Sequence, residues 1–246
     1  MEKYRNTIEF EVYGDYALFS NPVLRVGGEK SSYHIPTYEA VKGIVESVYW
    51  KPTLRWVVDG VRVMKAIQTE TKGVRPISYN GGNELAYYTY LRDVCYQVRA
   101  HFEFNLNHPE LEVDRCEHKH HNIAKRMVQR GGRRDIFLGT RECQAFVEPC
   151  IFGEGESYYD SMPGEIAFGF MYHGITYADE AVLPEEKNKM TVNFWRPVMK
   201  PGGIIEFIRP EECPQKRFIR EMKPKVFGTE KGNFAGIQEF RGEVSD

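Results

Sequence analysis

The sequence has few of the features that mark a membrane protein or a disulfide-bonded secreted protein. No apolar run approaches the roughly 18 residues that a transmembrane helix needs. The first residues, MEKYRNTIEF, are charged and include no apolar stretch of the kind found in signal peptides. The five cysteines are scattered without a CxxC pair, which favours a reducing compartment over a disulfide framework. We therefore expect a soluble, cytoplasmic protein with no membrane partner.

The chain also lacks a net charge that would indicate its partners. It carries 33 basic and 35 acidic residues, a formal net charge of −2, so the total gives no argument for nucleic-acid binding. Any basic surface must be local and offset by acidic stretches such as residues 110–114, 154–165 and 179–186. Repeats and low-complexity tracts are absent as well. A length of 246 residues suits one large domain or two small ones.

One basic stretch, EHKHHNIAKRMVQRGGRR at residues 117–134, has no acidic residue after its first position. Its apolar residues recur at the i, i+4 spacing of a buried helical stripe: Ile123, Ala124, Met127 and Val128. Gly131 and Gly132 are a plausible C-terminal stop. The pattern predicts a helix over residues 119–130 whose apolar face packs against the body of the protein.

The polar face of this predicted helix suits a polyanion. Its cations are Lys119, Lys125, Arg126, Arg130, Arg133 and Arg134, and its imidazoles are His118, His120 and His121. Each Lys or Arg laid against a phosphate releases condensed counterions, and a histidine with the usual pKa of about 6.5 exchanges protons near neutrality. Two other interpretations stay open at this point. The stretch is a solvated basic face, or Cys116 and the three histidines bind a metal, although their spacing lacks the usual paired ligands.

Hydrophobic patterns predict an α+β fold for the first part of the chain. Strands are expected at residues 7–13, 54–58, 61–64, 94–104 and 141–147, and a first helix capped by Thr37 is expected to run to about Val48. Asp59-Gly60 between two of the strands predicts a tight hairpin turn. The resulting order of elements is that of a ferredoxin-like domain, in which an antiparallel sheet carries two helices on one face.

The composition changes after residue 149. Residues 153–164 are rich in Gly, Glu and Ser, and strand-like runs follow at residues 165–177, 191–195 and 204–208. We expect a ferredoxin-like domain over residues 1–152, a small β-rich domain over residues 153–227 and a polar, mobile tail over residues 228–246.

Four stretches of the chain match motifs of a known family. They read EFEVYGDYALFSNP (residues 9–22), SYHIPTYEAVKGIVESVYWKPT (32–53), HKHHNIAKR (118–126) and NFWRPVMKPGG (193–203). Together they resemble the CRISPR-associated RAMP proteins of the fifth Cas family, in the catalytic variant of type I-C systems, over nearly the whole chain. The resemblance implies a ferredoxin-like (RRM-like, RAMP) domain followed by a small antiparallel sheet. It also implies cleavage of the repeat in precursor CRISPR RNA and retention of the guide's 5′ handle within the interference complex.

The resemblance further implies a cleavage triad. In the family it consists of a tyrosine at the end of the first helix, a lysine and the histidine that follows it, and the matching positions here are Tyr49, Lys119 and His120. His118 and His121 leave the choice of histidine open. Judged by the residues alone, a tyrosine at the position of Tyr49 is more often a core aromatic at a helix end, and Lys119 and His120 could bind phosphate without chemistry.

RNA supplies its own nucleophile, the 2′-OH, so this chemistry needs no metal or other cofactor. His120 suits proton transfer, which contributes about 10²–10⁴-fold in enzymes, and Lys119 suits stabilisation of the charged phosphorane oxygens. Tyr49 would orient the 2′-OH or share the proton transfer. The expected products are a 2′,3′-cyclic phosphate and a 5′-OH.

The expected partners are the repeat hairpin of the precursor RNA and the other subunits of the type I-C interference complex. Candidate RNA contacts are Lys125, Arg126, Arg130, Arg133, Arg134 and His121. Tyr87, Tyr88 and Tyr90 would stack on unpaired bases, or else pack a sheet face. Two alternative functions remain: a non-catalytic RNA-binding subunit of the same fold, and a metal-dependent nuclease that EDTA would stop.

Overall fold

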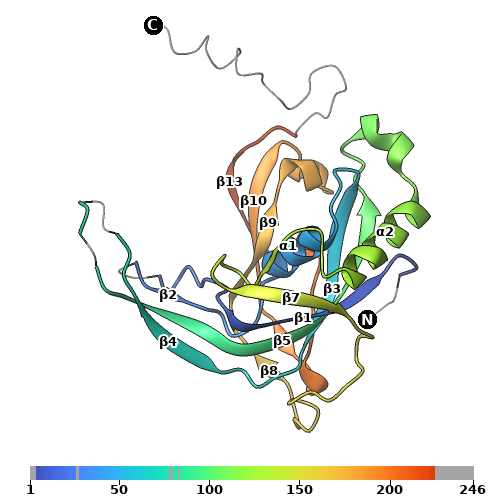
Figure 1. Ribbon diagram of the computed structural model, residues 1–246. Coiled ribbons are helices and arrows are strands. Elements are labelled where there is room, and N and C mark those ends of the chain that lie inside the picture. Colours follow the sequence, from blue (N-terminus) through green and yellow to red (C-terminus); the bar gives the residue numbers. More distant parts are fainter. Residues whose placement is uncertain (1–3, 26–27, 78–79, 83, 225–246) are drawn as a thin grey trace, which may run out of the picture.

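A twisted antiparallel sheet forms the centre of the protein in the computed structural model, which describes residues 4–25, 28–77, 80–82 and 84–224 (Figure 1). Its strand order is β12-β3-β5-β1-β7-β6, in which β12 (Ile204–Glu206) comes from a late part of the chain. The first elements along the chain are β1 (Ile8–Ala17), α1 (Tyr38–Val48), β3 (Leu54–Val63), β5 (Ala86–Phe104), α2 (Glu117–Gln129), β6 (Ile136–Phe137) and β7 (Gln144–Pro149). Strands β3, β5, β1 and β7 are ordered as in a ferredoxin-like domain, so the predicted fold is confirmed.

Both helices pack on one face of this sheet and have well-defined ends. The Thr37 hydroxyl accepts a hydrogen bond from the Ala40 N–H at 3.1 Å and caps α1, as predicted. At the end of α2, the Gly131 N–H donates to Val128 O and the Gly132 N–H to Met127 O. Gly131 has φ 84°, and these two bonds form a Schellman motif, which ends the helix where the sequence indicates.

The hairpin predicted at Asp59-Gly60 is wrong. Strand β3 continues through these residues without a turn. Its register against β5 shifts between Val58 and Gly60, which makes Asp59 the extra residue of a β-bulge. The Asp59 carboxylate lies 2.8 Å from Nδ1 of His101 on β5. The Asp-Gly pair therefore bends one long strand instead of joining two.

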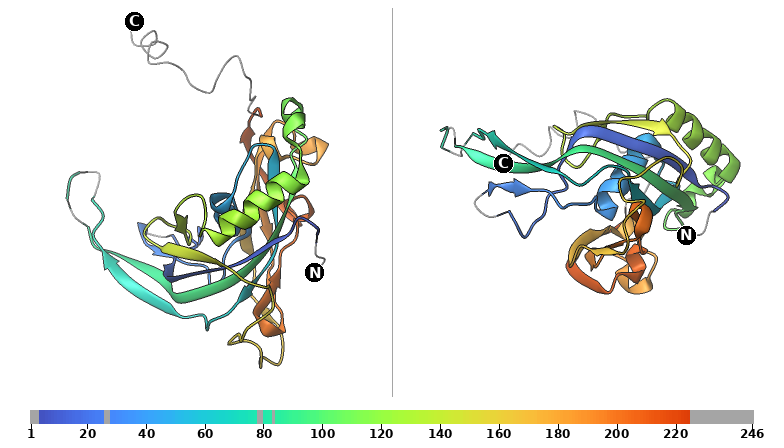
Figure 2. Two further views of the ribbon diagram at one scale, coloured as in Figure 1. Left: turned by 45° about the vertical axis from the view of Figure 1, so that its right-hand side comes forward. Right: turned by 90° about the horizontal axis from the view of Figure 1, so that it is seen from below.

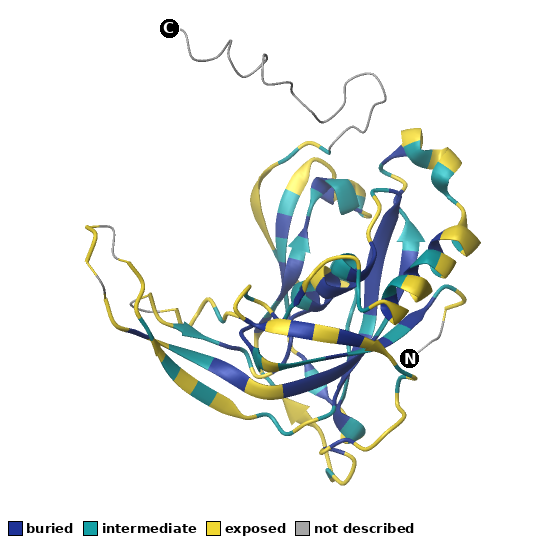
Figure 3. Cartoon of the chain, viewed as in Figure 1, coloured by how far each residue is buried: buried dark blue, intermediate teal, exposed yellow. Residues whose placement is uncertain are grey.

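The first half of β5 extends beyond the body of the protein and forms a projecting arm with β4 (Thr69–Val74) and β2 (Lys30–Ser31) (Figures 1 and 2). Residues along β4 alternate between exposed and half-buried (Figure 3). Of the three tyrosines considered for base stacking, Tyr87 is half-exposed, Tyr88 lies beneath the Lys30 ammonium and Tyr90 is buried.

A second sheet packs on the far side of α1, in the order β13-β10-β9. Its strands are β9 (Met171–Thr176), β10 (Lys189–Trp195) and β13 (Gln215–Glu221), and a separate ribbon pairs β8 (Ile166–Ala167) with β11 (Val198–Met199). Strand β12 (Ile204–Glu206) returns to the first sheet and pairs with β3. The proposed division near residue 152 remains a prediction, and the predicted tail lies outside the described residues.

Short 3₁₀ helices occur in several of the remaining connections. They are η2 (Pro109–Asp114), η3 (Ala178–Glu180), η4 (Pro184–Glu186), η5 (Pro201–Gly203) and η6 (Pro210–Glu212). No helix in the described part of the chain is long and apolar enough to span a membrane.

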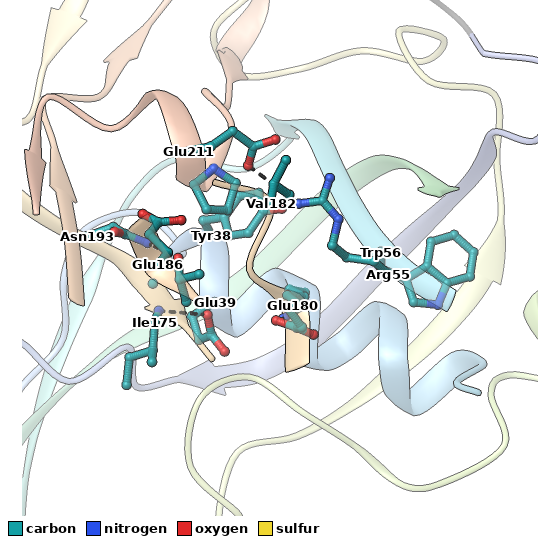
Figure 4. A pocket seen from close by; sticks show the side chains of 14 residues that line it. Tyr38, Glu39, Arg55, Trp56, Ile175, Glu180, Val182, Glu186, Asn193 and Glu211 are labelled. Atoms are coloured by element: carbon teal, nitrogen blue, oxygen red, sulfur yellow. Dashed lines mark hydrogen bonds and ion pairs between the residues drawn. The ribbon is translucent and has the colours of Figure 1, made fainter. Parts of the chain in front are cut away.

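Buried charges connect α1 to the second sheet (Figure 4). The Glu39 carboxylate accepts a hydrogen bond from the Ile175 N–H at 3.1 Å, and the Lys42 ammonium pairs with Glu180. Burial raises the pKa of Glu39, and it raises the pKa of Glu46 to about 7. These contacts fix α1 between two sheets, and with it the residue that follows the helix, Tyr49.

Candidate active site

The candidate site forms where the end of α1 meets the first turn of α2. Tyr49 is the C-terminal cap of α1, and its N–H donates to Val45 O. The Trp56 indole N–H donates to Tyr49 O at 2.7 Å. Because both polar groups of its backbone are held, Tyr49 presents its ring in one direction, toward His120 on α2. The structure thus brings together the three residues of the implied triad, with Lys119 adjacent to His120.

A chain of hydrogen bonds runs through His120. The Tyr49 hydroxyl lies 2.8 Å from His120 Nδ1, and His120 Nε2 lies 2.7 Å from the carbonyl oxygen of Asp114. A carbonyl oxygen only accepts, so Nε2 carries the proton and Nδ1 accepts from the Tyr49 hydroxyl. This arrangement defines the tautomer of a neutral imidazole and leaves its basic nitrogen directed at a phenol.

Asp114, the last residue of η2, completes the site. Its carboxylate pairs with the Lys119 ammonium, accepts a hydrogen bond from the Thr53 hydroxyl at 2.8 Å and lies 3.4 Å from His120 Nε2. The hydrogen bond from Lys119, followed by that from Thr53, lowers the pKa of the Asp114 carboxyl. Asp114 is therefore an anion placed to stabilise an imidazolium at His120. Sequence reasoning missed this role because the acidic stretch at residues 110–114 suggested only a charge offset.

The site lies largely beneath the surface. His120 is 0% exposed and packs against Phe102 and Phe104, and Tyr49 is 3% exposed, whereas the Lys119 side chain, 50% exposed, and the Asp114 side chain, 31% exposed, reach solvent. Burial and then the charge of Asp114 raise the pKa of the Tyr49 phenol, while Arg133 opposes them. A proton can therefore pass between Tyr49 and His120 along a hydrogen bond that is itself buried.

The basic face of α2 and the loop after it surround this site. The five cations predicted to contact RNA are exposed, and none has an acidic partner in the described part of the chain: Lys125, Arg126, Arg130, Arg133 and Arg134. The backbone N–H groups of Arg133 and Arg134 both donate to Ser47 O, in the last turn of α1. These bonds hold the two arginines beside Tyr49. His121, the sixth candidate, is half-buried, and its Nε2–H donates to Thr7 O.

Metal ligands do not gather at this site. Within the ranges that the structure describes, no group of three or more His, Cys, Asp and Glu side chains is placed to bind a metal. Of the four residues considered earlier as ligands, His120 uses both ring nitrogens in hydrogen bonds to protein groups.

Comparison with known proteins adds independent findings. Residues 7–206 match the family model Cas_Cas5d, described as CRISPR-associated protein (Cas_Cas5). Two similar curated proteins are named CRISPR pre-crRNA endoribonuclease Cas5d. The one from Mannheimia succiniciproducens is 27% identical over 169 residues, which cover 59% of this chain and 68% of that protein. The one from Thermus thermophilus is 26% identical over 151 residues, which cover 58% of this chain and 63% of that protein.

A solved structure described as a CRISPR-associated protein is similar as well. It is 36% identical, with a TM-score of 0.71, and the match covers 86% of this chain and 96% of that one. The structural similarity thus extends over 86% of this chain, whereas the matches to the two curated proteins cover about two thirds of their length.

Proposed function

Because the chain belongs to the Cas5d family of CRISPR-associated proteins, we propose that it is an endoribonuclease that cleaves the repeat in precursor CRISPR RNA. It acts without a metal ion, through the RNA's own 2′-OH, and remains on the 5′ handle as a subunit of the type I-C interference complex. The names of both curated relatives support the activity. The observation that carries the assignment to this site is the hydrogen-bonded chain from Tyr49 through His120 to Asp114.

The first step is removal of the 2′-OH proton. The Tyr49 oxygen takes this proton while its own passes to Nδ1 of His120, and the resulting imidazolium donates through Nε2–H toward Asp114. The 2′-oxygen then bonds to phosphorus, the P–O5′ bond breaks, and the leaving oxygen takes a proton from water. His120 returns its proton through Tyr49 to the hydroxide that this water leaves behind, so the protein regains its starting protonation and the products are a 2′,3′-cyclic phosphate and a 5′-OH. General base catalysis of this kind contributes about 10²–10⁴-fold.

Lys119 couples RNA binding to this proton transfer. Its ammonium pairs with Asp114 at the surface of the site. An RNA phosphate competes with the carboxylate for the same ammonium, so binding turns Lys119 toward the scissile phosphate, where it stabilises the charged oxygens. Asp114 then has His120 and Thr53 as its remaining partners, which favours the imidazolium when the base is needed.

The burial of Tyr49 and His120 favours a second candidate function. A tyrosine and a histidine that are 3% and 0% exposed are also what a purely structural hydrogen bond in a core would look like. On this view the protein binds the repeat through α2 and a separate nuclease cuts it.

Single-turnover cleavage of a labelled repeat hairpin in EDTA separates the two functions. We expect Tyr49→Phe and His120→Ala to slow cleavage about 10²–10⁴-fold and Lys119→Ala about 10²–10³-fold, with RNA still bound. Lys187→Ala, which removes an exposed lysine that has no acidic partner in the described ranges, serves as the control with full activity. A 2′-deoxy nucleotide at the cut site should abolish cleavage. Tight binding without cleavage by the wild type would establish the second function instead.

A further inference from the structure

A hollow lies along α2, between this helix and the N-terminal turn. Both views of Figure 2 show the N-terminal turn beside α2. The hollow has a volume of about 320 Å³, at the lower end of the roughly 300–1,000 Å³ typical of small-molecule sites. The turn that contains Tyr4 and Arg5 forms one wall, the edge of α2 that contains His121 and Lys125 forms the other, and Pro149 at the end of β7 closes one side. We call this hollow the α2 groove.

The lining of the α2 groove includes flat apolar surface. Ile8 and Val128 are buried residues that contribute to it, and Pro149 is exposed beside them. The Tyr4 ring, 38% exposed, stacks on the His101 ring with 3.8 Å between centroids. A ring held in this way offers a pre-formed surface for another planar group.

The rim of the α2 groove is cationic. Lys125 has no acidic partner in the described part of the chain, and the Arg5 side chain is 75% exposed, 3.6 Å from Glu117 and 3.2 Å from Nε2 of His118. The acid that lines the groove, Glu9, pairs with Arg99 at 2.9 Å, so its charge is offset. An anion that enters the groove therefore meets two lysine or arginine side chains.

Polar groups that could identify a ligand line the same wall. Because the His121 Nε2–H donates to Thr7 O at 3.0 Å, its Nδ1 is an acceptor. Burial lowers the pKa of His121, which keeps the ring neutral near pH 7. The Thr7 hydroxyl is buried and has no hydrogen-bond partner among the described residues. A site for phosphate alone would need neither a neutral acceptor nor an apolar lining.

We propose that the α2 groove binds one unpaired nucleotide of the repeat RNA, with its base against Tyr4 and His121 and its phosphate between Arg5 and Lys125. The proposal rests on the proposed function and extends it to recognition of a particular base. His121 follows His120 directly on α2, so the groove and the candidate catalytic histidine lie on the same turn of this helix. Unpaired bases are what RNA-binding proteins read through stacking and base-edge hydrogen bonds.

Binding of a repeat RNA that carries a 2′-deoxy nucleotide at the cut site tests this proposal without cleavage. We would measure Kd for a series in which each unpaired nucleotide in turn is made abasic. His121→Ala and Lys125→Ala should each weaken binding of the intact RNA about tenfold, and Lys187→Ala should leave it unchanged. One abasic position should weaken binding to the wild type about tenfold. The same abasic RNA should bind His121→Ala with the Kd that the intact RNA shows for this variant.

The outcomes separate the groove from the nuclease. If every abasic position weakens wild type and His121→Ala by the same factor, the groove reads no base and the proposal is overturned. If Lys125→Ala binds the intact RNA as tightly as the wild type does, the proposed contact between Lys125 and the phosphate is overturned. Because Lys125 is exposed, this substitution should not disturb the fold. Failure of the proposed function has a different signature: the wild type would not cut the ribose-containing repeat, whatever the groove variants bind.

Discussion

Asp114 contacts three side chains at once: the Lys119 ammonium, the Thr53 hydroxyl and the edge of the His120 ring. Its backbone oxygen also determines which nitrogen of His120 carries a proton. The backbone oxygen of Asp114 therefore orients the His120 ring, and its carboxylate supplies the negative charge beside that ring. A substitution that keeps the backbone and the side-chain shape can separate the two contributions.

Asp114→Asn should slow single-turnover cleavage about 10- to 100-fold with little change in RNA affinity. Loss of the carboxylate charge removes the anion that stabilises a protonated His120 ring during proton transfer. Single-turnover rates and RNA affinities of the variant and the wild type, measured under the same conditions, check this. A loss of RNA affinity as large as the loss of rate would show that Asp114 only holds the fold.

Gly139 illustrates a residue whose backbone cannot accept a side chain. It has φ 94°, and an added Cβ would overlap the carbonyl oxygen of Leu18. Gly139→Ala should lower the free energy of unfolding by more than about 2 kcal/mol in urea. Gly43→Ala, in the middle of α1 where an added Cβ meets nothing within 4 Å, should instead stabilise by about 0.5–1 kcal/mol. Equal effects of the two substitutions would contradict this account.

Elements with a strong hydrophobic period were predictable from sequence. Helices α1 and α2 follow their periodicity closely, whereas the strand predicted over residues 94–104 is only the second half of β5, which begins at Ala86. Strands β4 and β13 were missed because they are polar: β13 is largely exposed on the sheet edge, so its sequence shows no alternation. The prediction of a hairpin at Asp59-Gly60 was wrong because a bulge and a hairpin turn use the same residue types. Only the pairing of this strand with β5 distinguishes the two.

The site was predictable only in part. Tyr49, Lys119 and His120 were named through family resemblance, and their proximity follows from α1 and α2 packing side by side. The bond from His120 to the Asp114 carbonyl depends on how η2 bends before α2, and no local pattern encodes that bend. The burial of His120 was missed for a similar reason, since its place between Phe102 and Phe104 is a tertiary contact.

Helix α2 should dominate the salt dependence of RNA binding. Arg126 and Arg130 are exposed without acidic partners in the described ranges, so each can release a counterion when it meets a phosphate. The double variant Arg126→Ala/Arg130→Ala should flatten the slope of log K against log salt by about 1–2. Arg217→Ala/Arg220→Ala on β13, an equal loss of exposed charge, should leave it unchanged. The reverse result would place the RNA on the second sheet.

At the scale of the whole molecule, α1 is covered on two sides, by the first sheet and by the second. His173 on β9 marks the junction: it is fully buried, stacks on Tyr38 of α1 with 4.3 Å between centroids and hydrogen-bonds Ile208 O through Nε2. Burial lowers its pKa to about 4. The junction therefore depends on a neutral imidazole.

This histidine should make folding sensitive to mild acid. The unfolded chain takes up a proton at His173 near pH 6.5 and the folded chain only near pH 4, so the free energy of unfolding falls as pH drops between these values. The loss attributable to His173 reaches about 3 kcal/mol. Urea unfolding at pH 7.5 and 5 should show a smaller difference for His173→Phe than for the wild type. Parallel pH dependence in both proteins would assign the sensitivity to other groups.

The return of β12 to β3 has a consequence for the order of synthesis. The Arg62 guanidinium on β3 donates to the carbonyl oxygen of Gly202, 140 residues further along the chain, and β12 covers that strand's edge just beyond it. A ribosome adding about 5–20 residues per second needs roughly 7–28 s to make that stretch. Through that interval the nascent protein holds an open β edge, the kind of surface on which chains aggregate. The first sheet is therefore complete only when translation has passed residue 206, well beyond its own ferredoxin-like strands.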